Sequence, residues 1–95
     1  MNETTDIIFS WLKDEYPKTT WEASGESVIG YIGGVTLELR IFPKESIVSI
    51  WTKTPFKKAS KIREVRLSDP TSIGDLQEVV RHTIKITTNP FLGPT

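Results

Sequence analysis

Residues 35–41 read Val-Thr-Leu-Glu-Leu-Arg-Ile, a strict alternation of apolar and polar side chains. Because successive side chains of a β-strand point to opposite faces, this pattern predicts a strand with one buried face and one face toward solvent. Gly33 and Gly34 stand directly before it, and glycine readily adopts the positive φ angles of a tight hairpin turn. The chain is therefore constrained to build a half-buried antiparallel sheet.

Strand-like segments separated by short turn segments lie on both sides of this strand. We predict strands at about 19–23, 27–32, 35–42, 46–53 and 61–67. Consecutive strands joined by short connections usually pair with their neighbours in the chain. Four or five of these strands should therefore form an antiparallel meander.

Two amphipathic segments flank the predicted strands. A helix is predicted at 5–16, because apolar side chains recur there at helical spacing. A second helix is predicted at 70–86, with Asp69 as its N-cap and Pro70 in its first helical position. Residues 87–95, which contain two prolines and a glycine, are expected to form a tail.

The order of these elements predicts the fold class. We expect one α+β domain over residues 1–95, with an N-terminal helix, a four- to five-stranded antiparallel meander and a C-terminal helix. Two amphipathic helices can cover one face of such a sheet, so both should pack on the same face.

The residue types argue against catalysis and against a cofactor. The chain has no cysteine and one histidine, His82, which leaves no thiolate chemistry and no His/Cys cluster for zinc. No run approaches the roughly 20 apolar residues that a membrane span requires. We expect a non-enzymatic cytoplasmic protein without a metal site, a cofactor or a membrane partner.

Acidic and basic residues are unevenly distributed along a chain whose formal net charge is zero. Residues 1–26 hold six acids and two bases, a net charge of −4. Residues 40–66 hold eight bases and two acids, a net charge of +6. Any electrostatic function must come from this local asymmetry, because the whole chain has no net field.

The densest basic segment lies between the last two predicted strands and contains aromatic residues. Lysine and arginine contact phosphates, and bases stack on aromatic rings, which is how sequence-tolerant single-strand binders work. Alternation places Lys61 and Arg63 on one face of the last strand and Arg66 on the other. We predict a module for single-stranded or sequence-tolerant nucleic-acid binding through Lys53, Lys57, Lys58, Lys61, Arg63, Arg66, Trp51 and Phe56.

Other interpretations use the same residues. Lysines on a hairpin are often only solvated or block pairing at a sheet edge, and the acidic N-terminal segment could neutralise the basic hairpin within the fold. Trp51 could lie in the core or in a dimer interface. The chain could then be a protein-interaction module, such as a homodimer subunit, a chaperone or an inhibitor-like protein.

From residue 35 onward the pattern resembles the positive-cofactor-four family of single-stranded-DNA-binding domains, relatives of the Whirly proteins. Ile50-Trp51 is similar to that family's aromatic strand end, and Lys57-Lys58 lies where its basic loop would be. Segment 65–70 is similar to its strand-to-helix junction, although the glycine–lysine pairs of its loop are missing here. The resemblance implies DNA contacts from the open sheet face, and homodimers.

Overall fold

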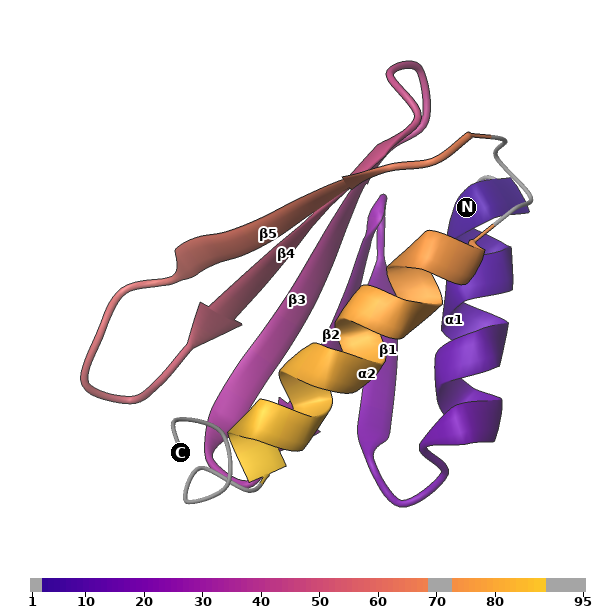
Figure 1. The fold of residues 1–95 in the computed structure, drawn as a ribbon. Helices are drawn as coiled ribbons and strands as arrows, with labels where there is room; N and C mark the ends of the chain where they lie inside the picture. Colours follow the sequence, from indigo (N-terminus) through magenta and orange to yellow (C-terminus); the bar gives the residue numbers. More distant parts are fainter. Residues whose placement is uncertain (1–2, 69–72, 89–95) are drawn as a thin grey trace.

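A computed structural model describes residues 3–68 and 73–88 of the chain (Figure 1). It confirms the α+β class, with one helix, five strands and a second helix in chain order. The elements are α1 (Glu3–Glu15), β1 (Thr20–Ser24), β2 (Ser27–Ile32), β3 (Val35–Phe42), β4 (Ile47–Lys53), β5 (Ser60–Arg66) and α2 (Gly74–Thr88).

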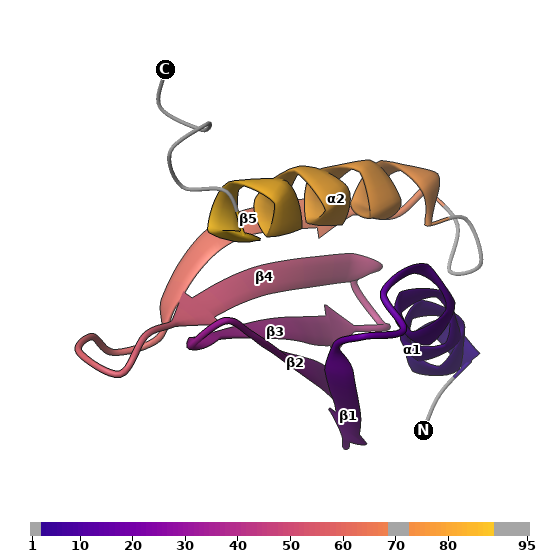
Figure 2. The same cartoon turned by 90° about the horizontal axis from the view of Figure 1, so that it is seen from below.

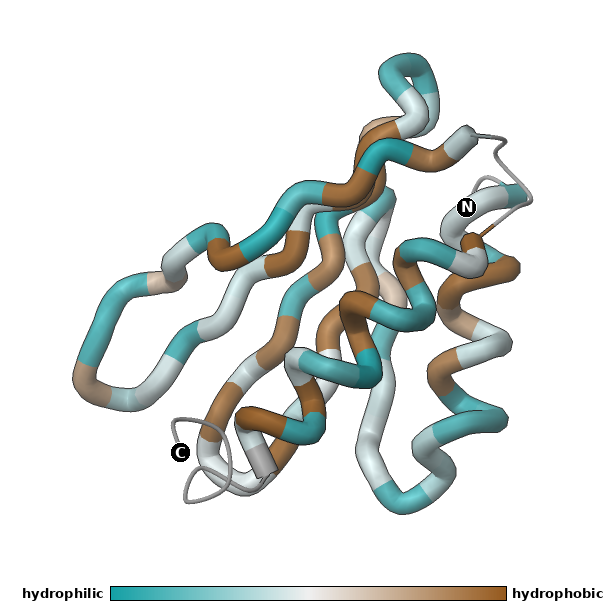
Figure 3. Tube along the Cα trace, in the orientation of Figure 1, coloured by the Kyte–Doolittle hydropathy of each residue, from teal (hydrophilic) through white to brown (hydrophobic). Residues whose placement is uncertain are grey.

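The five strands form one antiparallel sheet in the order β1-β2-β3-β4-β5, as the meander prediction requires. The turn between β2 and β3 uses Gly33 at φ 51° and Gly34 at φ 85°. Both values lie in the left-handed region that glycine enters without a steric penalty. Hydropathy alternates along the strands, and the turn between β3 and β4 is hydrophilic (Figure 3).

Both helices cover the same face of the sheet, as predicted (Figure 2). Alternate residues of β3 and β4 bury their side chains on this face, because Leu39 pairs with Ile50 and Ile41 pairs with Val48. The helices contribute the apolar stripes that were expected from their spacing. Their fully covered members are Ile8 and Leu12 of α1 and Leu76 and Val80 of α2. We call the opposite side of the sheet the open face.

Aromatic packing joins α1 to β1. Trp21 donates a hydrogen bond from its indole nitrogen to the carbonyl oxygen of Tyr16, at 3.2 Å. The Tyr16 ring lies 6.1 Å from that of Trp11 and 6.2 Å from that of Trp21. Trp21 pairs with Gly30 of β2, and a Cβ atom at position 30 would collide with the Trp21 ring. The close packing of this ring against β2 therefore favours glycine at position 30.

The helix boundaries differ from the prediction by a few residues. The first helix begins at Glu3 rather than at residue 5 and ends at Glu15. An acidic residue is favourable in the first turn, because the helix dipole is positive there. The second helix begins at Gly74 rather than at residue 70 and continues to Thr88, so it includes the first two residues of the predicted tail.

Some sequence predictions fall on parts of the chain that the structure does not describe. The predicted N-cap Asp69, the predicted first helical residue Pro70 and tail residues 89–95 lie outside the described ranges. Within residues 3–68 and 73–88, no helix is long and apolar enough to cross a membrane.

Candidate nucleic-acid interface

The eight residues predicted to bind nucleic acid come from β4, β5 and the loop between them, but the structure distributes them over three places. Paired residues on neighbouring antiparallel strands share a face, so the strand register assigns each one. The open face carries Trp51, Lys53, Lys61 and Arg66; the β4–β5 loop carries Phe56, Lys57 and Lys58; and Arg63 lies on the helix-covered side.

The separation of Lys61 from Arg63 corrects the sequence prediction that they share a face. Arg63 pairs with the core residue Ile50, whereas Lys61 pairs with Trp51 on the open face. The register shifts between these two pairs, which leaves Ile62 as an extra residue in β5. A β-bulge of this kind breaks the alternation of side chains along a strand. Arg63 therefore cannot act beside Trp51.

The centre of the open face is occupied by interactions within the protein. The Arg40 guanidinium lies 3.9 Å from the centre of the Trp51 ring and pairs with Glu38 at 3.2 Å. The Trp51 indole nitrogen donates a hydrogen bond to Ser49 Oγ at 3.0 Å. One face of the Trp51 ring is therefore already covered by a cation. We call Glu38, Arg40, Ser49 and Trp51 the central cluster.

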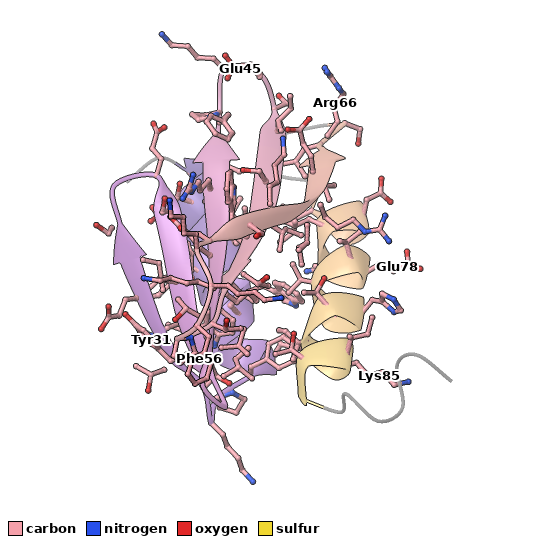
Figure 4. The ribbon with its side chains drawn as sticks, turned by 90° about the vertical axis from the view of Figure 1, so that its left-hand side faces the viewer. Tyr31, Glu45, Phe56, Arg66, Glu78 and Lys85 are labelled. Atoms are coloured by element: carbon pink, nitrogen blue, oxygen red, sulfur yellow. The ribbon has the colours of Figure 1, made fainter. Side chains whose placement is uncertain are left out.

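The end of the sheet beside the β4–β5 loop is different. Phe56 is 94% exposed, the largest value among the exposed large apolar side chains of the described residues. Lys53, Lys57 and Lys58 are also exposed, and none of them makes an ion pair with any residue in the described ranges. Figure 4 shows Phe56 at the end of the sheet opposite Glu45. We call Lys53, Phe56, Lys57 and Lys58 the loop-end cluster.

A shallow pocket adjoins the loop-end cluster. It holds about 200 Å³ and is lined by Gly34, Thr36, Lys53, Thr54 and Pro55. Thr36 and Lys53 are paired across β3 and β4, so their side chains stand together on the open face. The pocket combines one ammonium group with two hydroxyl groups and the backbone of a glycine turn. These are groups that bind phosphate oxygens.

Tyr31 extends this end of the sheet onto β2. It is half exposed, and its hydroxyl group donates a hydrogen bond to Glu22 Oε2 at 3.3 Å. The negative charge of Glu22 raises the pKa of Tyr31 above its usual value, with smaller contributions from desolvation and from the hydrogen bond. Tyr31 pairs with Thr36, which in turn pairs with Lys53. Tyr31, Thr36 and Lys53 therefore form a row across three neighbouring strands, and this row ends at the loop-end cluster.

Two of the predicted basic residues, Lys61 and Arg66, are less available than the loop-end lysines for binding a ligand at this end of the sheet. Lys61 pairs with Glu64 at 3.4 Å, although both side chains are about half exposed, with values of 48% and 50%. Such an exposed pair is worth at most about 1 kcal/mol and exchanges readily for another anion. Arg66 lies at the far end of the sheet, as Figure 4 shows.

The acidic N-terminal segment does not neutralise the basic hairpin among the residues described. Glu15 pairs with Arg81 of α2 at 3.2 Å, and Glu22 accepts the hydrogen bond from Tyr31. No ion pair in the described ranges joins an acid of residues 3–26 to a base of residues 53–66. The same ranges contain no group of three or more His, Cys, Asp or Glu side chains that could hold a metal ion.

Comparison of the chain with protein-family models, with curated proteins and with solved structures finds no match. The resemblance to the positive-cofactor-four family therefore rests on the order of elements alone. The function has to be argued from the chemistry of the site.

Proposed function

We propose that this protein is a non-enzymatic module that binds single-stranded nucleic acid at the loop end of its sheet. One observation carries the proposal: the side chain of Phe56 is 94% exposed between lysines that have no ion-pair partner among the described residues. An aromatic ring left in water is costly, at about 25 cal/mol per Å² of apolar surface. A stacked base would cover it.

The charges at this end suit a phosphate backbone. Lys57 and Lys58 extend from the loop, while Lys53 stands at the end of β4 and Lys61 at the start of β5. Four contacts to single-stranded phosphates would give a slope of about −3 for log K against log salt concentration, at roughly −0.7 per contact. The pocket beside Lys53 would take the phosphate nearest the sheet.

The same geometry favours single strands over a duplex. Phe56 offers one isolated ring at a loop tip, and a base reaches such a ring only when it is unstacked and unpaired. Trp51 has no comparable role in the proposal, because Arg40 covers one face of its ring. Stacking is therefore assigned to Phe56.

The charge requirement is tested by reversing charge at one end of the sheet at a time. The double variant Lys57→Glu with Lys58→Glu should lose more than about tenfold in affinity for a labelled single-stranded oligonucleotide, because two phosphate contacts are removed. The matched control, Lys44→Glu with Arg66→Glu, makes the same charge change at the other end and should bind almost as well as the unmodified protein. Equal losses in both variants would refute a site at the loop end.

The stacking requirement is tested with two phenylalanines. Phe56→Ala should weaken oligonucleotide binding by about 1–3 kcal/mol, the usual contribution of one stacked base. Phe42, also exposed on the open face but at the far end of β3, provides the control, and Phe42→Ala should leave affinity unchanged. An unaltered affinity in Phe56→Ala would remove base stacking from the proposal.

A further inference from the structure

A second hollow lies on the helix-covered side of the sheet, away from the loop-end cluster. It holds about 330 Å³ between α2 and strands β4 and β5, and its lining includes Thr52, Ile62, Arg63, His82 and Ile86. This volume is at the lower end of the range of small-molecule sites, which is about 300–1,000 Å³. We call it the α2–β5 groove.

The groove lies beside the exposed half of β5. Val65 is the only buried residue of β5, and the preceding five residues of the strand are exposed. The bulge at Ile62 lies in this exposed half. Ile62 and Arg63 from this half of β5 line the groove together with residues of the C-terminal half of α2.

The groove has an apolar part contributed by two elements. Ile62 of β5 is 44% exposed and Ile86 of α2 is 43% exposed, and both line the same hollow. Large aliphatic side chains that remain exposed on facing elements offer a surface that a hydrocarbon chain would remove from water. Ile62 and Ile86 therefore suit a ligand that has an aliphatic part.

The polar part of the groove is basic. Arg63 and His82 line it, no carboxylate is among its lining residues, and Arg63 makes no ion pair within the described ranges. His82 is the only histidine of the chain. The planar guanidinium group of arginine matches the two oxygens of a carboxylate.

The geometry points to a binding site for a small amphipathic carboxylate. The carboxylate of the ligand would be held by Arg63 with His82 beside it, and its short aliphatic chain would lie against Ile62 and Ile86. This site is independent of the proposed nucleic-acid interface, since Arg63 stands on the opposite side of the sheet from Lys53 and Lys61.

The test uses the full chain and octanoate as the probe, with 1-octanol and acetate as half-ligands. Because His82 is the only histidine of the chain, the proton signal of its Cε1–H group can be assigned directly, and it should shift saturably with octanoate and scarcely at all with acetate. Arg63→Gln should weaken octanoate binding about tenfold or more, since a hydrogen bond to a charged group is lost. The same variant should change the affinity for 1-octanol less than twofold. The control Arg66→Gln, on the open face, should leave octanoate binding unchanged.

Two results would overturn the site. One is equal affinity of the unmodified protein for octanoate and 1-octanol, which would show that Arg63 and His82 do not bind the carboxylate. The other is an octanoate affinity that Arg63→Gln and Ile86→Asn both leave intact, which would place the ligand elsewhere. Because Ile86 is exposed on a helix surface, Ile86→Asn should remain folded, and circular dichroism checks this.

Discussion

Two groups of basic and aromatic residues, the central cluster on the open face and the loop-end cluster at the end of the sheet, differ in whether their side chains already have partners within the protein. In the central cluster, the cation of Arg40 covers Trp51 and pairs with Glu38. In the loop-end cluster, Phe56 is almost fully exposed and the lysines have no ion-pair partner in the described part of the chain. The same residue types therefore have a structural role in one place and are available to a ligand in the other.

Strand register explains the difference. Arg40 and Trp51 lie on neighbouring strands, where Trp51 is paired with Glu38 and Arg40 with Ser49. Cross-strand neighbours are close enough for their side chains to interact. The loop after β4 has no neighbouring strand on either side, so its side chains have few internal partners. The following predictions test this contrast, beginning with the largest expected effect.

Gly30→Ala should give the largest loss of stability. Its Cβ atom would collide with the Trp21 ring, and overpacking of this kind costs about 1–3 kcal/mol. Chemical denaturation measures the loss. If both clusters depend only on local geometry, the folded fraction of the variant should still bind oligonucleotide with unchanged affinity.

Arg40→Ala should destabilise the fold by about 1 kcal/mol, because it removes a cation–π contact and a partly exposed ion pair. Urea unfolding detects this change. Oligonucleotide affinity should not fall, since the central cluster has no place in the proposed site. A loss of affinity comparable to that in Phe56→Ala would erase the distinction between the two clusters.

Lys57→Gln with Lys58→Gln should change the free energy of unfolding by less than about 0.5 kcal/mol, the usual range for surface substitutions away from specific contacts. The two lysines are exposed and lack ion pairs in the described ranges. A stability loss as large as that of Arg40→Ala would show that these lysines are structural.

The smallest effect concerns the two tyrosines at alkaline pH. Burial raises the pKa of Tyr16 and Glu22 raises that of Tyr31, both above 10.0. A pKa that is higher in the folded state favours folding until the phenol ionises, so the contribution of the two tyrosines to stability should be constant below about pH 10 and be lost as the pH rises above it. In Glu22→Gln the pKa of Tyr31 should decrease toward 10.0, as absorbance titration of the phenolate would show.

Sequence patterns predicted the fold well because periodicity reports burial directly. The alternation in 35–41 fixed both the strand and the face it buries, and Gly33-Gly34 fixed the turn before it. The second helix is described from Gly74, whereas its predicted start at residue 70 lies outside the described ranges.

The candidate site was only partly predictable. The exposure of Phe56 follows from its place in a loop. The bulge that separates Lys61 from Arg63 has no signal in the sequence, because Ile62 is an ordinary strand residue and neither glycine nor proline marks the shift. The Arg40–Trp51 contact depends on register between strands, which alternation within one strand does not specify.

The most direct test of the central claim compares salt dependence across three proteins: the unmodified chain, Lys57→Gln with Lys58→Gln, and Lys44→Gln. Each is titrated with the same single-stranded oligonucleotide over a salt series. The slope of log K against log salt concentration should be about −3 for the unmodified chain and for Lys44→Gln, and about −1.4 for the double variant. Equal slopes in all three proteins, or no binding at about 50 mM salt where phosphate contacts are strongest, would contradict a phosphate-binding role for the loop-end lysines.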